Sequence, residues 1–150
     1  MANGGSGQAL SEQEQLARRQ AVRDLMPKTP YLAWLGVVIE RWEPDSVTLR
    51  LPFRPELTND GQHYHGGVIA AVIDTAGAAA AWSNHDFNKG ARASTVSLSI
   101  QYASAAKSSD LLCHAKVLRR AKELTFADIL AVDDRGAVVA HALETYRIAT

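Results

Sequence analysis

The spacing of apolar residues changes along the chain, and each change predicts a different kind of element. Near the start, Ser11 and Glu14 have the spacing of a capping box, and apolar residues at helical spacing follow until two prolines end the helix. This apolar stripe consists of Leu16, Val22, Leu25 and Met26. A short helical turn at 31–35, closed by Gly36, comes next. We therefore expect residues 1–30 to form a flexible leader and an N-terminal helix that precede the main domain.

A period of two residues predicts strands in two parts of the chain. Runs at 37–42 and 47–51 are separated by a Glu-Pro-Asp turn. After a polar loop and a long apolar segment, TVSLSIQY (95–102) alternates between polar and apolar side chains. Three further strand-like runs follow, with short polar turns between them, at 111–119, 124–132 and 137–148. The pattern predicts five to six strands that meander antiparallel.

The segment between these two groups of strands, HYHGGVIAAVIDTAGAAAAW (63–82), predicts one long apolar helix. Many of its side chains are small, which lets neighbouring backbones approach closely. A sheet must cover its apolar face, and this helix is the element apolar enough to do so. We therefore expect an α+β fold for residues 31–150, in which a curved antiparallel sheet wraps around one long central helix.

Composition narrows the class of protein. Of the 150 residues, 47% are apolar and 21% are charged, and 16 basic residues balance 16 acidic ones. This composition favours a globular domain over nucleic-acid or membrane-surface binding. The sequence shows neither an uncharged apolar run of the roughly 20 residues that cross a bilayer nor the pattern of a secretory signal. The single cysteine, Cys113, cannot form an internal disulfide, which favours a cytoplasmic protein with this residue in its core.

Asp74 is the unexpected residue of the long helix. An unpaired carboxylate in an apolar environment is costly or takes up a proton. Its helical neighbours Ala70, Gly77 and Ala78 offer no partner side chain. One interpretation is structural, with Asp74 capping a backbone group or pairing with a charge within the core. The other is functional, since a carboxylate held in a cleft is typical of a catalytic acid or base.

Gly66 and Gly67 begin the same helix, and their backbone N–H groups are expected to lack intrahelical acceptors. Together with the helix dipole, these donors favour an oxyanion at this end. Gly66 and Asp74 are eight residues apart, about 12 Å along the helix axis, which is too far for both to act on one carbonyl. Two such helices lying antiparallel would bring Gly66 of one chain near Asp74 of another. The spacing therefore predicts an obligate dimer with shared sites.

These residues, in this order, resemble the hotdog-fold acyl-CoA thioesterases of the phenylacetic-acid-degradation and 4-hydroxybenzoyl-CoA types. The resemblance rests on Asn59, His65-Gly66-Gly67, Asp74 and the strand TVSLSIQY, and it covers roughly residues 31–148. It implies a hotdog fold and hydrolysis of an aryl- or medium-chain acyl-CoA to the carboxylic acid and coenzyme A. It further implies no metal, no cofactor apart from the coenzyme A of the substrate, and a homodimer or a homotetramer built as a dimer of dimers.

Carried over position by position, the resemblance implies a role for each site residue. The Gly66 N–H would polarise the thioester carbonyl, and Asp74 of a second subunit would be the nucleophile or the general base for water. Asn59 would help to hold the thioester or the attacking water. His65 would shape the helix start, and Thr95 would place a hydroxyl near the carboxylate.

A second group of residues is expected to bind the rest of the substrate. Gly67 lies at the helix start, and the corner Arg119-Arg120-Ala121-Lys122 is the best basic cluster for the nucleotide phosphates of coenzyme A. The alternative for this corner is an ordinary solvated hairpin turn. His63 has no assigned role and is expected to be a solvated loop residue.

Two other functions stay open. A non-catalytic acyl-CoA-binding hotdog protein would use the same groove, although such a sensor would normally carry a DNA-binding domain, for which the first 30 residues are too short. An acyl-thioester hydratase or dehydratase would pair a catalytic histidine with an acid, usually within a longer proline-rich signature. Here no proline follows Pro55, which favours thioester hydrolysis.

Overall fold

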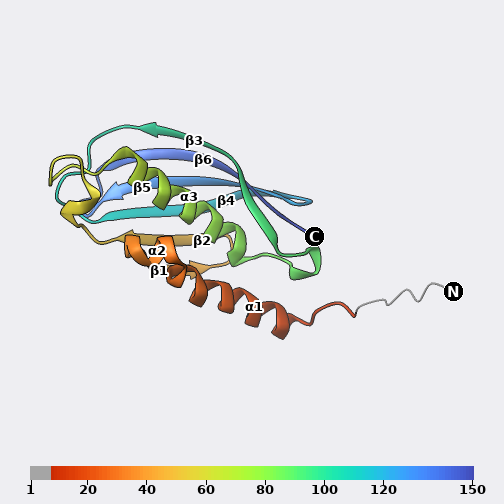
Figure 1. The fold of residues 1–150 in the computed structure, drawn as a ribbon. Coiled ribbons are helices and arrows are strands. Elements are labelled where there is room, and N and C mark those ends of the chain that lie inside the picture. Colours follow the sequence, from red (N-terminus) through yellow and green to blue (C-terminus); the bar gives the residue numbers. More distant parts are fainter. Residues whose placement is uncertain (1–7) are drawn as a thin grey trace.

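The computed structural model describes residues 8–150, so residues 1–7 of the predicted leader lie outside the described residues (Figure 1). The helices are α1 (Glu12–Leu25), α2 (Pro30–Leu35) and α3 (Gly66–Ser83), with 3-10 turns at Met26–Lys28, Pro55–Leu57 and Phe87–Lys89. The strands are β1 (Val38–Glu43), β2 (Ser46–Leu51), β3 (Arg92–Tyr102), β4 (Leu111–Ala121), β5 (Leu124–Asp133) and β6 (Val138–Ala149). Each run that the sequence pattern assigned to a strand is one, with bounds shifted by a few residues.

The strands form a single antiparallel sheet in the order β1-β2-β4-β5-β6-β3. The long helix α3 lies across one face of this sheet (Figure 1) and contacts all of its strands. By length and hydropathy alone α3 could cross a membrane, but 61% of it is buried within the protein, as in the core helix of a globular domain. The predicted sheet around one central helix is confirmed.

The core lies between α3 and the sheet. Along β6 and β5, every second residue points at α3 and is buried. The helix contributes mostly small side chains, and Val72 and Ile73 are its largest fully buried ones. Because alanine and glycine dominate the rest of its surface, the backbone of α3 can lie close to the strands. The site residues on α3 are therefore held at fixed positions over the sheet.

The N-terminal helix α1 docks through polar contacts. Its predicted capping box is present, but Leu16 and Leu25 of the predicted apolar stripe are 65% and 62% exposed. Instead, Gln15 is buried; its Nε2 donates to Asp86 Oδ1 (2.7 Å) and its Oε1 accepts from the Phe87 N–H (2.9 Å). The expectation of a buried stripe was wrong for the two leucines, because α1 meets a polar loop beyond the end of α3.

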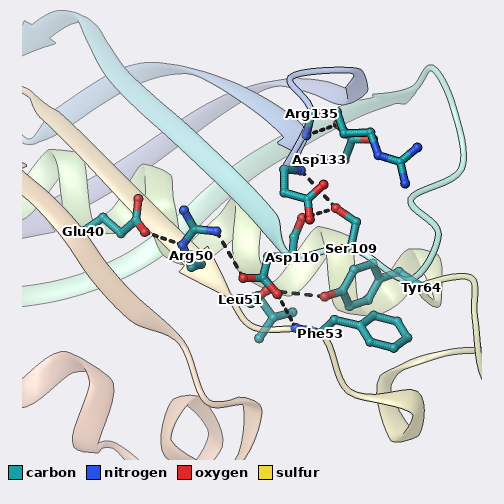
Figure 2. Close-up of polar contacts among 10 residues, drawn as sticks. Glu40, Arg50, Leu51, Phe53, Tyr64, Ser109, Asp110, Asp133 and Arg135 are labelled. Carbon is teal, nitrogen blue, oxygen red and sulfur yellow. Dashed lines mark hydrogen bonds and ion pairs between the residues drawn. The ribbon is translucent and has the colours of Figure 1, made fainter.

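A polar network fixes the loop that leads into α3. Figure 2 shows Arg50 of β2 between Glu40 of β1 and Asp110, which precedes β4. Asp110 also accepts a hydrogen bond from the Phe53 N–H (2.8 Å). The buried Tyr64 donates its hydroxyl to a backbone carbonyl of β2 at 3.4 Å. Both ends of the loop are thereby tied to the sheet, and the start of α3 has a defined position.

The other end of α3 is held by Arg120. Its guanidinium donates to the carbonyl oxygens of Ala80 (3.2 Å) and Ala81 (2.9 Å), and its Nε donates to Asp45 in the β1–β2 turn (2.8 Å). These acceptors lie near the C-terminus of the helix, where a positive charge is favourable. Arg120, half-buried, therefore joins the helix end, the β1–β2 turn and β4.

Arg120→Ala should lower the free energy of unfolding by about 2–3 kcal/mol, because it leaves several buried acceptors and one carboxylate without their charged donor. The neighbouring Arg119 is exposed, which makes Arg119→Ala a matched control with an expected change within about 0.5 kcal/mol. Urea denaturation followed by circular dichroism measures both. Equal midpoints for the two variants would contradict the anchoring role of Arg120.

Candidate active site

His65 caps the start of α3. It lies in extended backbone at φ −62° and ψ 134°, and its Nδ1 accepts the Gly67 N–H at 2.8 Å. A Cβ at position 67 would lie 2.9 Å from that nitrogen, so glycine leaves room for the imidazole to fold over the helix start. The expectation that Gly67 offers a free donor was wrong, because the neighbouring histidine takes it.

Gly66 keeps its donor. Among residues 8–150, no acceptor is bound to the Gly66 N–H, which is the first of the helix. Its carbonyl accepts the hydroxyl of Tyr102 at 2.8 Å, and the ring of Tyr102 covers the α-carbon side of Gly66. An oxyanion at this end can therefore bind one backbone N–H in the field of an 18-residue helix. No role was assigned to Tyr102 from the sequence, because the alternation along β3 identified it only as one of the apolar positions.

Asp74 finds its partner on β3. The half-buried carboxylate accepts a hydrogen bond from Thr95 Oγ1 at 2.6 Å. Within the described residues no Lys, Arg or His forms an ion pair with Asp74. The hydroxyl of Thr95 orients one oxygen of the Asp74 side chain. The structure thus brings together the acid and the hydroxyl residue, on the helix and on the edge strand of the sheet.

A second carboxyl group lies beside this pair, and sequence reasoning missed it. Glu144 of β6 is 2% exposed, and burial, reinforced by the negative charge of Asp74, raises the pKa of Glu144 to about 9. The sequence contained an indication of its position. On a strand with a period of two, Glu144 points to the same side as Ala140 and Ala142, which face α3. A pKa this high favours the neutral acid form of Glu144 at neutral pH.

Comparisons with known proteins identify the family of the chain. A family model described as the thioesterase superfamily matches residues 61–140, more than half of the chain. The chain belongs to the thioesterase superfamily. A candidate esterase of Halobacterium salinarum is 35% identical to this superfamily member over 104 residues, which cover 67% of this chain and 68% of the relative.

Solved structures of the superfamily have the same fold. The E. coli PaaI protein from the phenylacetic acid degradation operon matches with a TM-score of 0.78 at 20% identity, over 91% of this chain and 96% of that one. A hypothetical thioesterase protein of Streptococcus pneumoniae, solved with coenzyme A, matches with a TM-score of 0.67 at 19% identity, over 75% of this chain and 85% of that one. The expected hotdog fold is confirmed.

In this superfamily member, Asn59 lies on the exposed loop before α3. Its N–H donates to the His63 carbonyl (3.0 Å), and the flanking residues Thr58 and Tyr64 form a bridge. The bridge places Asn59 at the Gly66 end of α3, more than two helical turns from Asp74. His63, expected to be solvated, pairs its Nδ1 with Asp60 at 2.7 Å and is 40% exposed.

The basic corner divides into two parts. Arg120 is engaged with the end of α3 and Asp45, as described above. Arg119 and Lys122 instead line a surface depression of about 770 Å³ together with Arg147, whose guanidinium is paired with Glu123 at 2.7 Å. Because Arg147 lies between two residues of β6 that point at α3, this depression opens on the other face of the sheet.

The cap of α3 gives a direct test of how its start is built. His65→Ala should lower the free energy of unfolding by about 1 kcal/mol, since it removes the acceptor of the Gly67 N–H. His65→Asn should retain most of the stability, because asparagine is a strong N-cap residue. Chemical denaturation compares the three proteins. An equal loss of unfolding free energy in both variants, or no loss in either, would show that the cap does not stabilise the helix.

Proposed function

We propose that this protein is an acyl-CoA thioesterase that hydrolyses an aryl- or medium-chain acyl-CoA to the carboxylic acid and coenzyme A. The observation that carries the proposal is the Asp74–Thr95 pair, a carboxyl group oriented by a hydroxyl at the edge of the sheet. Membership of the thioesterase superfamily supports the reaction class. The coenzyme A in the pneumococcal structure supports the proposed form of the substrate.

The reaction needs an oxyanion donor and a base or nucleophile. The thioester carbonyl would accept the free Gly66 N–H, which stabilises the negative charge that develops on its oxygen. Asp74 would either remove a proton from the attacking water or attack the carbonyl carbon itself. In the base route the C–S bond breaks, the thiolate of coenzyme A leaves and takes up the proton that Asp74 removed, and the water oxygen ends in the carboxylic acid. In the nucleophile route the thiolate leaves an anhydride between the acyl group and Asp74, and water then cleaves this anhydride to release the acid and restore Asp74.

The two groups would come from different subunits. Gly66 and Asp74 lie on one helix about 12 Å apart, so one chain cannot place both on a single carbonyl. β3 is an edge strand of 11 residues whose side chains are mostly exposed, including Val96 and Tyr102 at 56% and 53%. An exposed edge of this length favours pairing with a second chain. We therefore propose a dimer joined through β3, with a dimer of dimers as its possible larger form.

Coenzyme A adds a long, anionic part to the substrate. In this proposal Arg119 and Lys122 bind its nucleotide phosphates, because both are basic residues lining one depression. Arg120 has no part in it, since its guanidinium is already bonded to protein acceptors. The depression and Asp74 lie on opposite faces of one sheet. A substrate that reaches both would have to bind at a junction between subunits, which is a further reason to place it there.

Asp74→Asn should lower kcat by about 100-fold or more on every accepted substrate, because asparagine keeps the volume but neither removes a proton nor attacks the carbonyl. A panel of aryl, short, medium and long acyl-CoA substrates, assayed by release of free thiol, measures it. Asp128→Asn, which changes an exposed carboxylate on β5 paired with His141, is the matched control. Absence of turnover by the wild-type protein across the panel would instead favour a non-catalytic acyl-CoA-binding protein.

The shared site predicts complementation between two inactive variants. Asp74→Asn lacks the acid, and Gly66→Pro lacks the donor. Proline suits a first helical position, and a Cβ at Gly66 would meet only ordinary contacts of 3.6–3.7 Å with Tyr102. Random pairing makes about half of the dimers mixed, each with one intact site of two, so about a quarter of wild-type activity should return in the unsorted mixture and about half in purified mixed dimers.

Coexpression of two differently tagged chains, followed by tandem purification, yields the mixed dimers for this assay. Circular dichroism establishes that the proline variant is folded. If both residues served one chain's site, no mixture of these subunits could contain an intact site. Zero recovery from purified mixed dimers would therefore rule out the shared arrangement.

A further inference from the structure

Glu144 is buried without a partner. The residue is 2% exposed, and neither of its carboxyl oxygens has a hydrogen-bond partner among residues 8–150. The carboxyl group rests against Gly77 of α3, where a Cβ would lie only 2.1 Å from Oε2. Glycine at this position therefore makes the space for the Glu144 carboxyl group. Because Gly77 leaves room that the carboxyl group of Glu144 fills, this carboxyl group has a defined position and is not part of a loosely packed side chain.

The groups that surround Glu144 include one other carboxyl group. From α3, Asp74 lies one helical turn before Gly77 and so on the same side of the helix. β3 presents Leu98 and β5 presents Ala127 at the paired positions, and neither can titrate. On β6 itself, Tyr146 shares the inward phase of Glu144, and burial raises the pKa of this tyrosine above its ordinary value. The titratable groups facing Glu144 are thus Asp74 and Tyr146, both anionic when they ionise.

We propose that Glu144 is a positioning residue beside Asp74, held as a neutral acid against Gly77 so that it adds no second negative charge to the site. The proposal rests on the proposed function, because it assigns Asp74 to thioester hydrolysis. Two adjacent carboxyl groups in a poorly solvated place cannot both ionise at low cost. The fully buried Glu144 therefore keeps its proton, whereas the half-buried Asp74 accepts the hydroxyl of Thr95.

The proton on Glu144 has a consequence for catalysis. Attack on a thioester develops negative charge on the carbonyl oxygen, and a second fixed negative charge beside Asp74 would oppose it. Ionisation of Glu144 should therefore switch the site off, and kcat/KM should fall as pH rises through the pKa of about 9. If the ionised form is inactive, the fall is about tenfold between pH 8 and pH 10, as for a single titrating group.

The same proton affects stability, with a definite sign. The pKa of Glu144 rises from an ordinary 4.5 to about 9 on folding, so over this range the folded protein binds more protons than the unfolded chain. Stability linked to Glu144 is then lost as pH rises from about 4.5 to about 9. Glu144→Gln, which cannot ionise, should gain melting temperature relative to wild type as pH rises through this window.

The decisive experiment compares pH profiles of kcat/KM, with uncatalysed hydrolysis subtracted. Wild-type protein should show the fall above about pH 9, and Glu144→Gln should lack it. Glu144→Met, another unbranched side chain of similar length, provides a second non-ionising variant in case the amide perturbs folding. Tyr146→Phe is the matched control and should keep the fall, since it leaves the Glu144 carboxyl group in place. An alkaline fall that is unchanged in both Glu144 variants would overturn the positioning role.

A readout independent of turnover separates this proposal from the proposed function. Infrared spectra at about pH 7 should show the carbonyl stretch of a buried protonated carboxylic acid in wild-type protein, and Glu144→Gln should lack that band. Absence of the band in wild type would overturn the neutral state of Glu144 whatever the activity. If the band is present but no acyl-CoA is hydrolysed, the thioesterase proposal fails, and the link from Glu144 to catalysis fails with it.

Discussion

The burial of α3 against the sheet is the constraint on which the rest of the molecule depends. Each fully buried Val or Ile on this helix contributes about 2 kcal/mol, and the small residues around them allow close packing. Both ends of the helix are fixed by polar contacts, His65 at the start and Arg120 at the end. A helix held in this way presents an N–H at one end and a carboxylate in its middle without freedom to move either.

Burial against α3 is energetically unfavourable for the carboxyl groups that lie on or beside this helix. Asp74 is half-buried and accepts a hydrogen bond from a hydroxyl group on β3. Glu144 is fully buried without a donor among residues 8–150, and its high pKa is the physical response to that environment. Two acids of the same chemical type thereby meet different environments, and Gly77 supplies the space for the buried one.

The position of the site at the edge of the sheet links chemistry to assembly. Thr95 lies on β3, the edge strand, and Tyr102 on the same strand covers the start of α3. Any chain that pairs with β3 would therefore lie beside both the carboxylate and the helix start. One strand serves the orientation of Asp74, the positioning of Gly66 and, in our proposal, contact with a second subunit.

The order of helices and strands, the central helix, Asp74 and Gly66 were all predictable from the sequence, because periodicity, caps and turns act over a few residues. The partners of these groups were decided by the tertiary structure. Thr95 was placed near Asp74 only by family resemblance, and Glu144 was missed, since their distance from Asp74 depends on how separate strands pack on α3. Local spacing also misjudged α1, where Gln15 instead of leucine is buried, and Gly67, whose N–H is taken by His65. Sequence periodicity shows which residues share a face, whereas strand register and helix packing decide which group each of them meets.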